Sequence, residues 1–232
     1  METIGIVGGL SPYSTVVYYK LLVERARERM GRDPEIVILS ISIDSVRELV
    51  RRGDLDALAS LLGDAVRRLA AAGASVIGIA ANTPHMVFPL LEERAPGNVR
   101  LVSIVKAVVD KVALLGVRRV GLLATGPTVE SRLYHDALAR IGVEVVTPPP
   151  RLQERLDEAI RAVSRGLLDE RRGLLIGQLA GSLLARGAEA LVLGCTELPL
   201  LFSGLRVRVP VVDSLEEHVE ALLREAGLPR QG

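Results

Sequence analysis

Residues 191–199 have the sequence LVLGCTELP, in which an apolar run leads directly into a polar turn. A similar segment occurs about 114 residues earlier, because Gly73 precedes Ala81 by eight residues just as Gly187 precedes Cys195 by eight residues. A repeat of this length indicates two similar halves. Each half has roughly 100 residues, which is a normal size for one small α/β domain.

Elsewhere in each half, short apolar runs alternate with amphipathic stretches of about ten to twenty residues. This alternation is typical of βαβ units, which form a parallel sheet with helices on both faces. We therefore predict an α/β fold with two similar domains related by a pseudo-twofold axis, each with a four-stranded, mainly parallel sheet flanked by helices. The first domain is expected to comprise residues 1–103 plus 213–232, and the second residues 104–212.

The individual elements follow from where these runs and stretches fall. Strands are predicted at 3–8, 35–41, 75–80, 99–103, 118–124, 142–147, 189–194 and 207–212. Helices are predicted at 14–30, 54–72, 84–94, 104–115, 128–141, 151–164, 170–187, 197–202 and 214–226. Open parallel sheets bind ligands outside the carboxyl ends of their strands, so the turns after the strands are the candidate site.

The composition favours a compact protein that binds a small molecule. Of its 232 residues 49% are hydrophobic, and its formal net charge is +1 with acidic and basic residues interspersed. Such a balance speaks against a broad charged surface for nucleic acid or an anionic membrane. No run of 18 or more apolar residues occurs and residues 1–4 lack a charged leader, so we expect a cytoplasmic protein. The 26 arginines against three lysines favour a thermophilic source.

Four polar turns follow predicted strands, at residues 8–15, 82–85, 125–128 and 195–197. The repeat relates the first turn to the third and the second to the fourth. Because the carboxyl ends of parallel strands share one edge of a sheet, we expect all four turns to line one cleft between two domains. Ser, Thr and Asn also cap helices, and glycines permit tight turns. Ligand binding and these structural roles are therefore both open for the polar side chains in the turns.

Cys195 is the only cysteine, which excludes an intrachain disulfide and a thiolate zinc cluster. It is either a buried bystander or a catalytic thiol. It opens the turn into the helix predicted at 197–202, where the helix dipole and free N–H groups favour the thiolate, and we expect the thiol to face a cleft rather than a core. Glu197 could orient the thiol or titrate with it, although acidic residues in a first helical turn also compensate the dipole.

No cofactor or metal is expected. None of the three lysines lies in a candidate turn, where a pyridoxal phosphate Schiff base would need one. No spaced set of histidines and carboxylates converges on a turn to bind a metal. His85 lies beside a candidate turn, whereas His135 and His218 fall within predicted helices, where surface positions are more common. The chemistry that remains is cofactor-free proton transfer at a carbon next to a carbonyl.

Four motifs together resemble the aspartate/glutamate racemase superfamily, whose members need no cofactor. They are IGIVGGLSP at 4–12, ANTPH at 81–85, LLAT at 122–125 and GCTE at 194–197, and the resemblance spans nearly the whole chain. Glu197 makes the last motif similar to the aspartate racemase branch, because histidine usually follows Gly-Cys-Thr in glutamate racemases. The resemblance implies a homodimer that acts on aspartate or a related acidic amino acid.

In that family two cysteines flank the α-carbon of the substrate; one removes its proton and the other returns a proton to the opposite face. The resemblance implies that Cys195 is one of them, with Thr83 and Glu197 also in catalytic positions, and that the second cysteine is replaced by Ala81. Arg47, in a loop predicted at 42–47, is either a ligand of the side-chain carboxylate or a solvated helix residue. The residues implied for substrate binding are Asn82, Thr83, Thr125, Thr196, Arg47 and Ser11.

The alanine at position 81 leaves three functions open. A racemase with one cysteine would use water, Thr83 or His85 as its second proton carrier, and would be slow or differ between the two directions. A decarboxylase of malonate-type substrates needs only one thiol, and a non-enzymatic binder of acidic amino acids needs none. We favour the aspartate racemase-like function, because the flanking motifs are intact and an acidic substrate explains Glu197 and Arg47 together.

Overall fold

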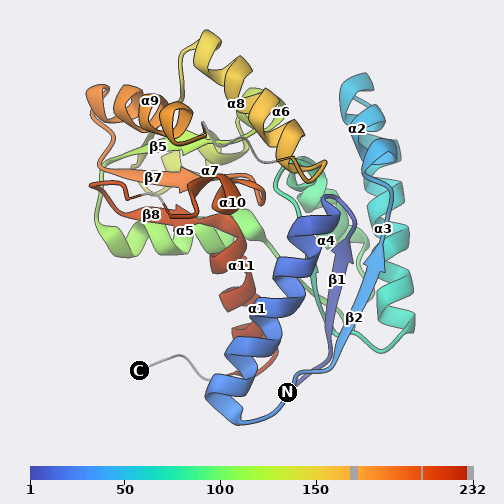
Figure 1. The fold of residues 1–232 in the computed structure, drawn as a ribbon. Helices are drawn as coiled ribbons and strands as arrows, with labels where there is room; N and C mark the ends of the chain where they lie inside the picture. The colour runs from blue at the N-terminus through green and yellow to red at the C-terminus, as the bar shows by residue number, and fades with distance from the viewer. Residues whose placement is uncertain (168–171, 205, 229–232) are drawn as a thin grey trace. The chain divides into compact units, whose positions relative to one another are not determined.

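The computed structural model describes residues 1–167, 172–204 and 206–228 (Figure 1). Its contacts divide the chain into two compact units. The first unit is Met1–Ile104 with Leu215–Gly232, and the second is Val105–Ser214. Among the described residues, no helix is both long enough and apolar enough to cross a membrane.

The first unit is built on a sheet with the strand order β2-β1-β3-β4, in which every neighbouring pair is parallel. Its strands are β1 (Ile4–Gly8), β2 (Ile36–Ser40), β3 (Val76–Ile79) and β4 (Arg100–Val102). Its helices are α1 (Pro12–Met30), α2 (Ile43–Arg52), α3 (Leu55–Ala71), a 3₁₀ turn (Thr83–Val87), α4 (Phe88–Arg94) and α11 (Ser214–Glu225). The C-terminal helix therefore packs with the N-terminal unit.

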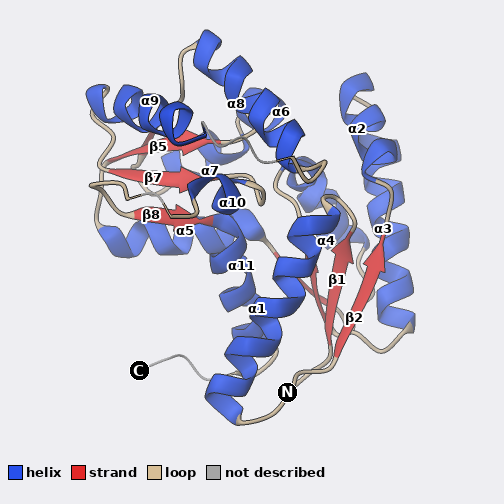
Figure 2. Ribbon diagram, in the orientation of Figure 1, coloured by secondary structure: helices blue, strands red, loops and turns tan. Residues whose placement is uncertain are grey.

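The second unit has the strand order β6-β5-β7-β8, and its neighbouring strands are again parallel. Its strands are β5 (Arg119–Leu123), β6 (Glu144–Val146), β7 (Ala190–Leu193) and β8 (Val211–Asp213). Its helices are α5 (Ile104–Leu115), α6 (Gly126–Glu130), α7 (Leu133–Ala139), α8 (Pro150–Val163), α9 (Arg172–Ala185) and α10 (Leu198–Phe202). Figure 2 shows helices on both sides of this sheet, with α9 and α5 on opposite faces.

The two sheets have the same topology, since β1 corresponds to β5, β2 to β6, β3 to β7 and β4 to β8. The predicted fold class, two four-stranded parallel sheets flanked by helices, is confirmed. The central strands β1, β3 and β7 are buried along their whole length, and β5 is buried except at its first residue, as expected for strands covered on both faces. Their carboxyl ends are therefore the places where each chain segment leaves the core and can meet a ligand.

The loop predicted at 42–47 is wrong, because these residues belong to α2 and the residue before it. The sequence carried the signals of this helix. Apolar Ile43, Val46 and Val50 recur at helical spacing, and Gly53 ends the helix with a φ of 67°. Arg47 consequently lies on a helix, as in the alternative of a solvated helix residue.

Most other elements lie within two residues of their predicted bounds, and three differ by more or are divided. The helix predicted at 128–141 is divided into α6 and α7, because Arg132 adopts a left-handed conformation with a φ of 57°. The strand predicted at 207–212 begins only at Val211, since Pro210 has no N–H to donate to the ladder. The helix predicted at 84–94 begins with the 3₁₀ turn, and the first two residues of the helix predicted at 170–187 lie outside the described residues.

Two buried histidines hold the first unit together around α11. His218 Nε2 donates to the carbonyl oxygen of Val102 at 2.9 Å, and its Nδ1 accepts from the hydroxyl of Tyr18 at 2.9 Å. The expectation that His218 lies on the surface is therefore wrong. The ring packs so closely on β3 that a Cβ at Gly78 would lie 2.8 Å from it. His85 stands edge-on to His218, with ring centroids 6.1 Å apart.

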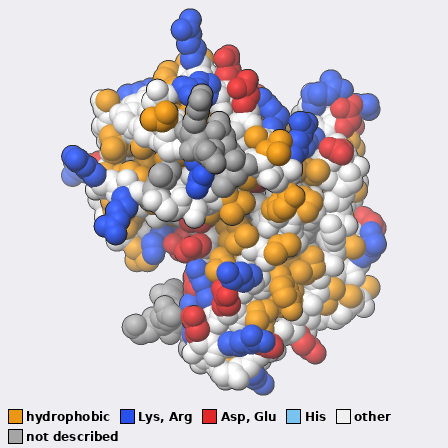
Figure 3. All heavy atoms as spheres, in the orientation of Figure 1, with side chains coloured by type: hydrophobic (Ala, Val, Ile, Leu, Met, Phe, Trp, Pro, Cys, Tyr) orange, Lys and Arg blue, Asp and Glu red, His pale blue; other side chains and the backbone are white. Residues whose placement is uncertain are grey.

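The charged side chains form no field of one sign on the face drawn in Figure 3, where basic and acidic groups are interspersed. Several of them pair along single helices, as Glu48 does with Arg51 and Arg52. Exposed pairs of this kind contribute little to stability. This surface agrees with the formal net charge of +1.

Candidate functional site

In the first unit, Ser11 lies in the turn between β1 and α1 and is fully buried. It caps α1, because its Oγ accepts a hydrogen bond from the N–H of Ser14 at 3.5 Å. Thr15 closes the same turn, since its hydroxyl accepts from the N–H of Gly9 at 2.9 Å and donates to the carbonyl of Ser11 at 3.0 Å. These hydroxyls therefore have the capping and turn-closing roles that were predicted as an alternative to ligand binding. Substrate binding by Ser11 stays a prediction.

The second candidate turn follows β3 in the same unit. Ala81 is half-buried, Asn82 is buried, and Thr83 is half-buried at the start of the 3₁₀ turn. The side chain of Asn82 makes no capping hydrogen bond to this turn. Because β1 and β3 are neighbours in the sheet, Asn82 and Ser11 lie at the same edge of the first unit.

Both ring nitrogens of His85 form hydrogen bonds with backbone atoms. Its Nε2 accepts from the N–H of Ile104 at 3.2 Å, so Nδ1 carries the proton and donates to the carbonyl of Ala81 at 2.8 Å. Burial, together with the neighbouring His218, lowers the pKa of His85 to about 3. A neutral imidazole with both nitrogens bonded to backbone atoms is poorly suited to carry a proton to a substrate. Water, Thr83 and His85 are the candidates for the second proton carrier, and this geometry argues against His85.

Arg47 lies on α2, which follows β2. Its side chain is 47% exposed and its Nη1 is 3.9 Å from Oδ1 of Asp44, one turn earlier on the helix. Since β2 neighbours β1, α2 begins at the same edge of the sheet as the Ser11 turn. This exposure agrees with the alternative that Arg47 is a solvated helix residue. Binding of a carboxylate by Arg47 stays a prediction.

In the second unit, Thr125 is the residue before α6, and its hydroxyl lies 3.0 Å from that of Thr128. Helix α8 adds two residues that the sequence analysis missed. Asp157 Oδ1 accepts from the N–H of Gly126 at 2.9 Å, and Gln153 Nε2 donates to the carbonyl of Ala124 at 2.9 Å. No local pattern marks these residues, because they lie 31 and 29 positions from their partners in the sequence.

Cys195, Thr196 and Glu197 form a compact buried group after β7. The thiol of Cys195 donates to Oε2 of Glu197 at 3.0 Å, and the hydroxyl of Thr196 donates to the same oxygen at 3.2 Å. Because β5 and β7 are paired up to Leu123 and Leu193, this group lies at the same edge of the sheet as Thr125. The structure therefore brings the predicted residues of the second unit together.

The expectation that a helix start favours the thiolate is wrong for Cys195. Burial raises the pKa of the thiol well above its ordinary value, and the charge and hydrogen bond of Glu197 raise it further. Asp157 contributes in the same direction. Helix α10 has only five residues, so its dipole is weak against two carboxylates. The expectation that the thiol faces a cleft rather than a core is also wrong within this unit, because the side chain is 7% exposed and packs in the apolar core. The resting group is therefore a neutral thiol.

We expect Glu197→Gln to lower the pKa of Cys195, because the amide removes the negative charge and keeps an oxygen that can accept from the thiol. The measurement is the rate of alkylation by iodoacetamide between pH 7 and 10, which should shift to lower pH and rise severalfold at neutral pH. Glu189→Gln is the matched control, since Glu189 lies at the amino end of β7 beside the N–H of Arg118. An unchanged profile in Glu197→Gln would show that this carboxylate does not govern the thiol.

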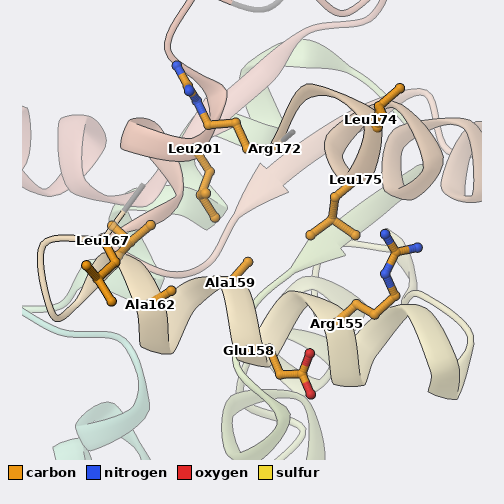
Figure 4. A pocket seen from close by; sticks show the side chains of 10 residues that line it. Arg155, Glu158, Ala159, Ala162, Leu167, Arg172, Leu174, Leu175 and Leu201 are labelled. Atoms are coloured by element: carbon orange, nitrogen blue, oxygen red, sulfur yellow. The ribbon is translucent and has the colours of Figure 1, made fainter. Parts of the chain in front are cut away.

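A separate pocket of about 540 Å³ lies among α8, α9 and α10 (Figure 4). Leu175 and Leu201 form part of its apolar wall, and Arg155 and Glu158 lie along α8. None of the predicted site residues belongs to the described lining of this pocket. Within the described parts of the chain, no group of three or more His, Cys, Asp or Glu residues is arranged to hold a metal ion.

The comparison with known protein families agrees with this arrangement of strands and polar turns. A family model described as Asp/Glu/Hydantoin racemase matches residues 7–222. The chain belongs to this family, and the resemblance found from its motifs is confirmed.

Individual relatives cover nearly the whole chain. A putative Asp/Glu racemase from Yersinia pestis is 29% identical with a TM-score of 0.87, covering 97% of this chain and 99% of that one. An aspartate racemase homologue from Pyrococcus horikoshii OT3 is 35% identical with a TM-score of 0.83 and the same coverage. A broad specificity amino-acid racemase from Bacillus subtilis is 22% identical over 216 residues, 91% of this chain and 92% of that protein.

Proposed function

We propose that the protein transfers the α-proton of an acidic amino acid, with aspartate as the first substrate to test, and that Cys195 is the acid/base. The observation that carries the proposal is the Cys195–Glu197 hydrogen bond of 3.0 Å at the carboxyl end of β7, in a chain of the Asp/Glu/Hydantoin racemase family. No cofactor takes part in this proposal, because a thiol and a carboxylate are sufficient to move a proton.

The resting thiol sets the order of the steps. Cys195 first gives its proton to Glu197, whose Oε2 already accepts the S–H hydrogen bond. The thiolate then removes the proton from the α-carbon, and the electron pair of the C–H bond moves into the carboxylate to form an enolate-like intermediate. Hydrogen-bond donors from Asn82, Thr83, Thr125 and Thr196 are proposed to stabilise its negative charge. Return of this proton from Cys195 to the same face of the α-carbon restores the starting enantiomer, and Glu197 then gives its proton back to the thiolate.

The opposite face of the intermediate needs a second proton carrier. Ala81 follows β3 as Cys195 follows β7 in the equivalent sheet, and it has no ionisable group. We propose that Thr83, or water held by it, donates a proton there and regains one from solvent, while Glu197 releases to solvent the proton that it took from Cys195. A threonine hydroxyl is a far weaker acid than a thiol, so inversion should be slower than exchange at the face served by Cys195.

The choice of aspartate rests on particular residues. Glu197 occupies the position that distinguishes aspartate-type from glutamate-type motifs, and Arg47 is proposed to pair with the side-chain carboxylate, with Ser11 as a further substrate contact. Relatives carry the names aspartate racemase homologue, broad specificity amino-acid racemase and glutamate racemase. The substrate test must therefore include more than one amino acid.

The proposal is tested by incubating the protein with each enantiomer of aspartate and glutamate and following the other enantiomer by chiral chromatography. We expect slow inversion, fastest with aspartate. Release of carbon dioxide from a substituted malonate without inversion of either amino acid would favour a decarboxylase. Binding that raises the melting temperature without any turnover would favour a non-enzymatic binder.

Ala81→Cys is expected to raise the rate of aspartate inversion by about 10²- to 10⁴-fold, the usual contribution of a positioned acid or base. Ala81 is half-buried beside the core of the first unit, so a side chain with one additional heavy atom meets limited crowding. The measurement is the initial rate of inversion in both directions. Ala81→Ser adds a group of similar size that ionises far less readily, and it should leave the rate near that of the unmodified protein. Equal effects of the two substitutions would contradict the missing-thiol explanation.

A further inference from the structure

Helix α8 directs two polar residues toward the turn that begins α6. Gln153 and Asp157 are four residues apart and therefore lie on one face of the helix. Asp157 Oδ1 accepts hydrogen bonds from the N–H of Gly126 at 2.9 Å and from Nε2 of Gln153 at 3.2 Å. Gln153 also donates to the carbonyl of Ala124 at 2.9 Å. Figure 1 shows α8 beside α6, in agreement with their packing.

The orientation of the Gln153 amide follows from its partners. The carbonyl oxygen of Ala124 and the carboxylate oxygen of Asp157 are both acceptors, so the NH₂ group must face them. The amide oxygen Oε1 consequently points the other way. It is buried and has no hydrogen-bond partner among the residues that the structure describes. A buried acceptor without a donor is uncommon, and a bound ligand is one way to supply the missing hydrogen-bond donor.

The negative charges of Asp157 and Glu197, which both act on Cys195, point to a cationic ligand. Asp157 is half-buried and Glu197 is buried, and within the described residues neither carboxylate forms an ion pair. Both act on Cys195, whose pKa they raise together with burial. A positive group bound next to Asp157 would offset this negative charge. An amino-acid substrate brings such a group in its ammonium, which also supplies the hydrogen-bond donors that Oε1 of Gln153 needs.

We propose that Asp157 and Gln153 bind the ammonium group of the substrate, with the Asp157 carboxylate as its counter-ion and Gln153 Oε1 as a second acceptor. The inference rests on the proposed function, because it assigns one contact of the same amino acid. It gives substrate binding a second effect. The bound ammonium makes loss of the Cys195 proton easier, so the thiol is activated only when an amino acid is present.

Paired ligands test this assignment by isothermal titration calorimetry. Aspartate and succinate carry the same two carboxylates and differ in the ammonium. We expect the unmodified protein to bind aspartate about 10- to 100-fold more tightly than succinate, the range for one hydrogen-bonded charge pair. In Asp157→Asn the preference should fall to near unity while succinate binding is kept or improved. The asparagine retains an oxygen for the N–H of Gly126, and retained succinate binding reports that the site is folded.

Glu154→Gln is the matched control, because it removes the same charge from an exposed position of the same helix, and its preference for aspartate should equal that of the unmodified protein. Gln153→Met, which removes Oε1, should reduce the preference without weakening succinate. An unchanged preference in Asp157→Asn, or an equal loss of both ligands, would overturn the assignment and leave the proposed function in place. Failure of the unmodified protein to bind either ligand would instead overturn the acidic substrate, and the ammonium contact with it.

Discussion

Cys195→Ser is expected to lower exchange of the α-hydrogen of aspartate by about 10²- to 10⁴-fold, the contribution of one positioned acid/base. Serine can occupy the space of cysteine and can donate to Oε2 of Glu197, as the thiol does at 3.0 Å. Its hydroxyl is much less acidic than a thiol, so Glu197 cannot generate a comparable base from it. The measurement is the loss of the α-proton signal of aspartate in deuterated water by NMR.

Binding separates this chemical effect from damage to the site. Cys195→Ser should bind aspartate nearly as well as the unmodified protein, because the thiol contributes to proton transfer and not to holding the carboxylates. Cys195→Ala, which leaves Glu197 without the thiol, should be at least as inactive. If either variant exchanged the α-hydrogen at the full rate, Cys195 would be a bystander in the apolar core.

The second large effect is a loss of folding stability at acidic pH. Burial lowers the pKa of His85 to about 3, with His218 as a further cause, and burial lowers the pKa of His218 to about 4. In the unfolded chain a histidine has a pKa of about 6.5, so between these values the unfolded state binds more protons than the folded state. Stability is therefore complete above about pH 6.5 and falls as the pH decreases. Between pH 7.5 and 5.0 the free energy of unfolding should fall by about 2 kcal/mol for each histidine.

Urea denaturation at several pH values measures this loss. His218→Gln should reduce the slope of the unfolding free energy against pH by about one proton near pH 5, even if it lowers stability at every pH. His135→Gln is the control, because His135 is half-buried and should contribute a smaller slope. A slope that is the same in His218→Gln and in the unmodified protein would show that His218 is not held neutral.

Much of the fold could be predicted because its strands are short apolar runs with clear ends. β1, β3 and β7 are buried throughout, so their sequences are apolar without interruption, and the repeat between the halves reinforced each assignment. The wrong predictions concern residues whose conformation or burial depends on tertiary contacts. The left-handed Arg132 divides a stretch that is amphipathic throughout, and His218 has a polar side chain that only Tyr18 and Val102 make compatible with burial.

The candidate site was predictable in part for the same reason. Residues such as Thr125 and Cys195 directly follow buried strands, so their place at a sheet edge could be read from the sequence. Asp157 and Gln153 could not be found in this way, because they come from the middle of α8 and meet their partners only in the folded unit. The raised pKa of Cys195 was also missed, since burial and two carboxylates outweigh a five-residue helix.

The central claim is that Cys195 serves one face of the α-carbon without a thiol for the other. It is tested most directly by incubating D-aspartate and L-aspartate separately in deuterated water and measuring deuterium in the recovered substrate and in the inverted product. We expect one enantiomer to gain deuterium without inversion much faster than it inverts, and the other to exchange slowly. In Ala81→Cys, deuterium should appear mainly in the inverted product. Equal rates for both enantiomers, with deuterium only in the inverted product of the unmodified protein, would contradict a single thiol.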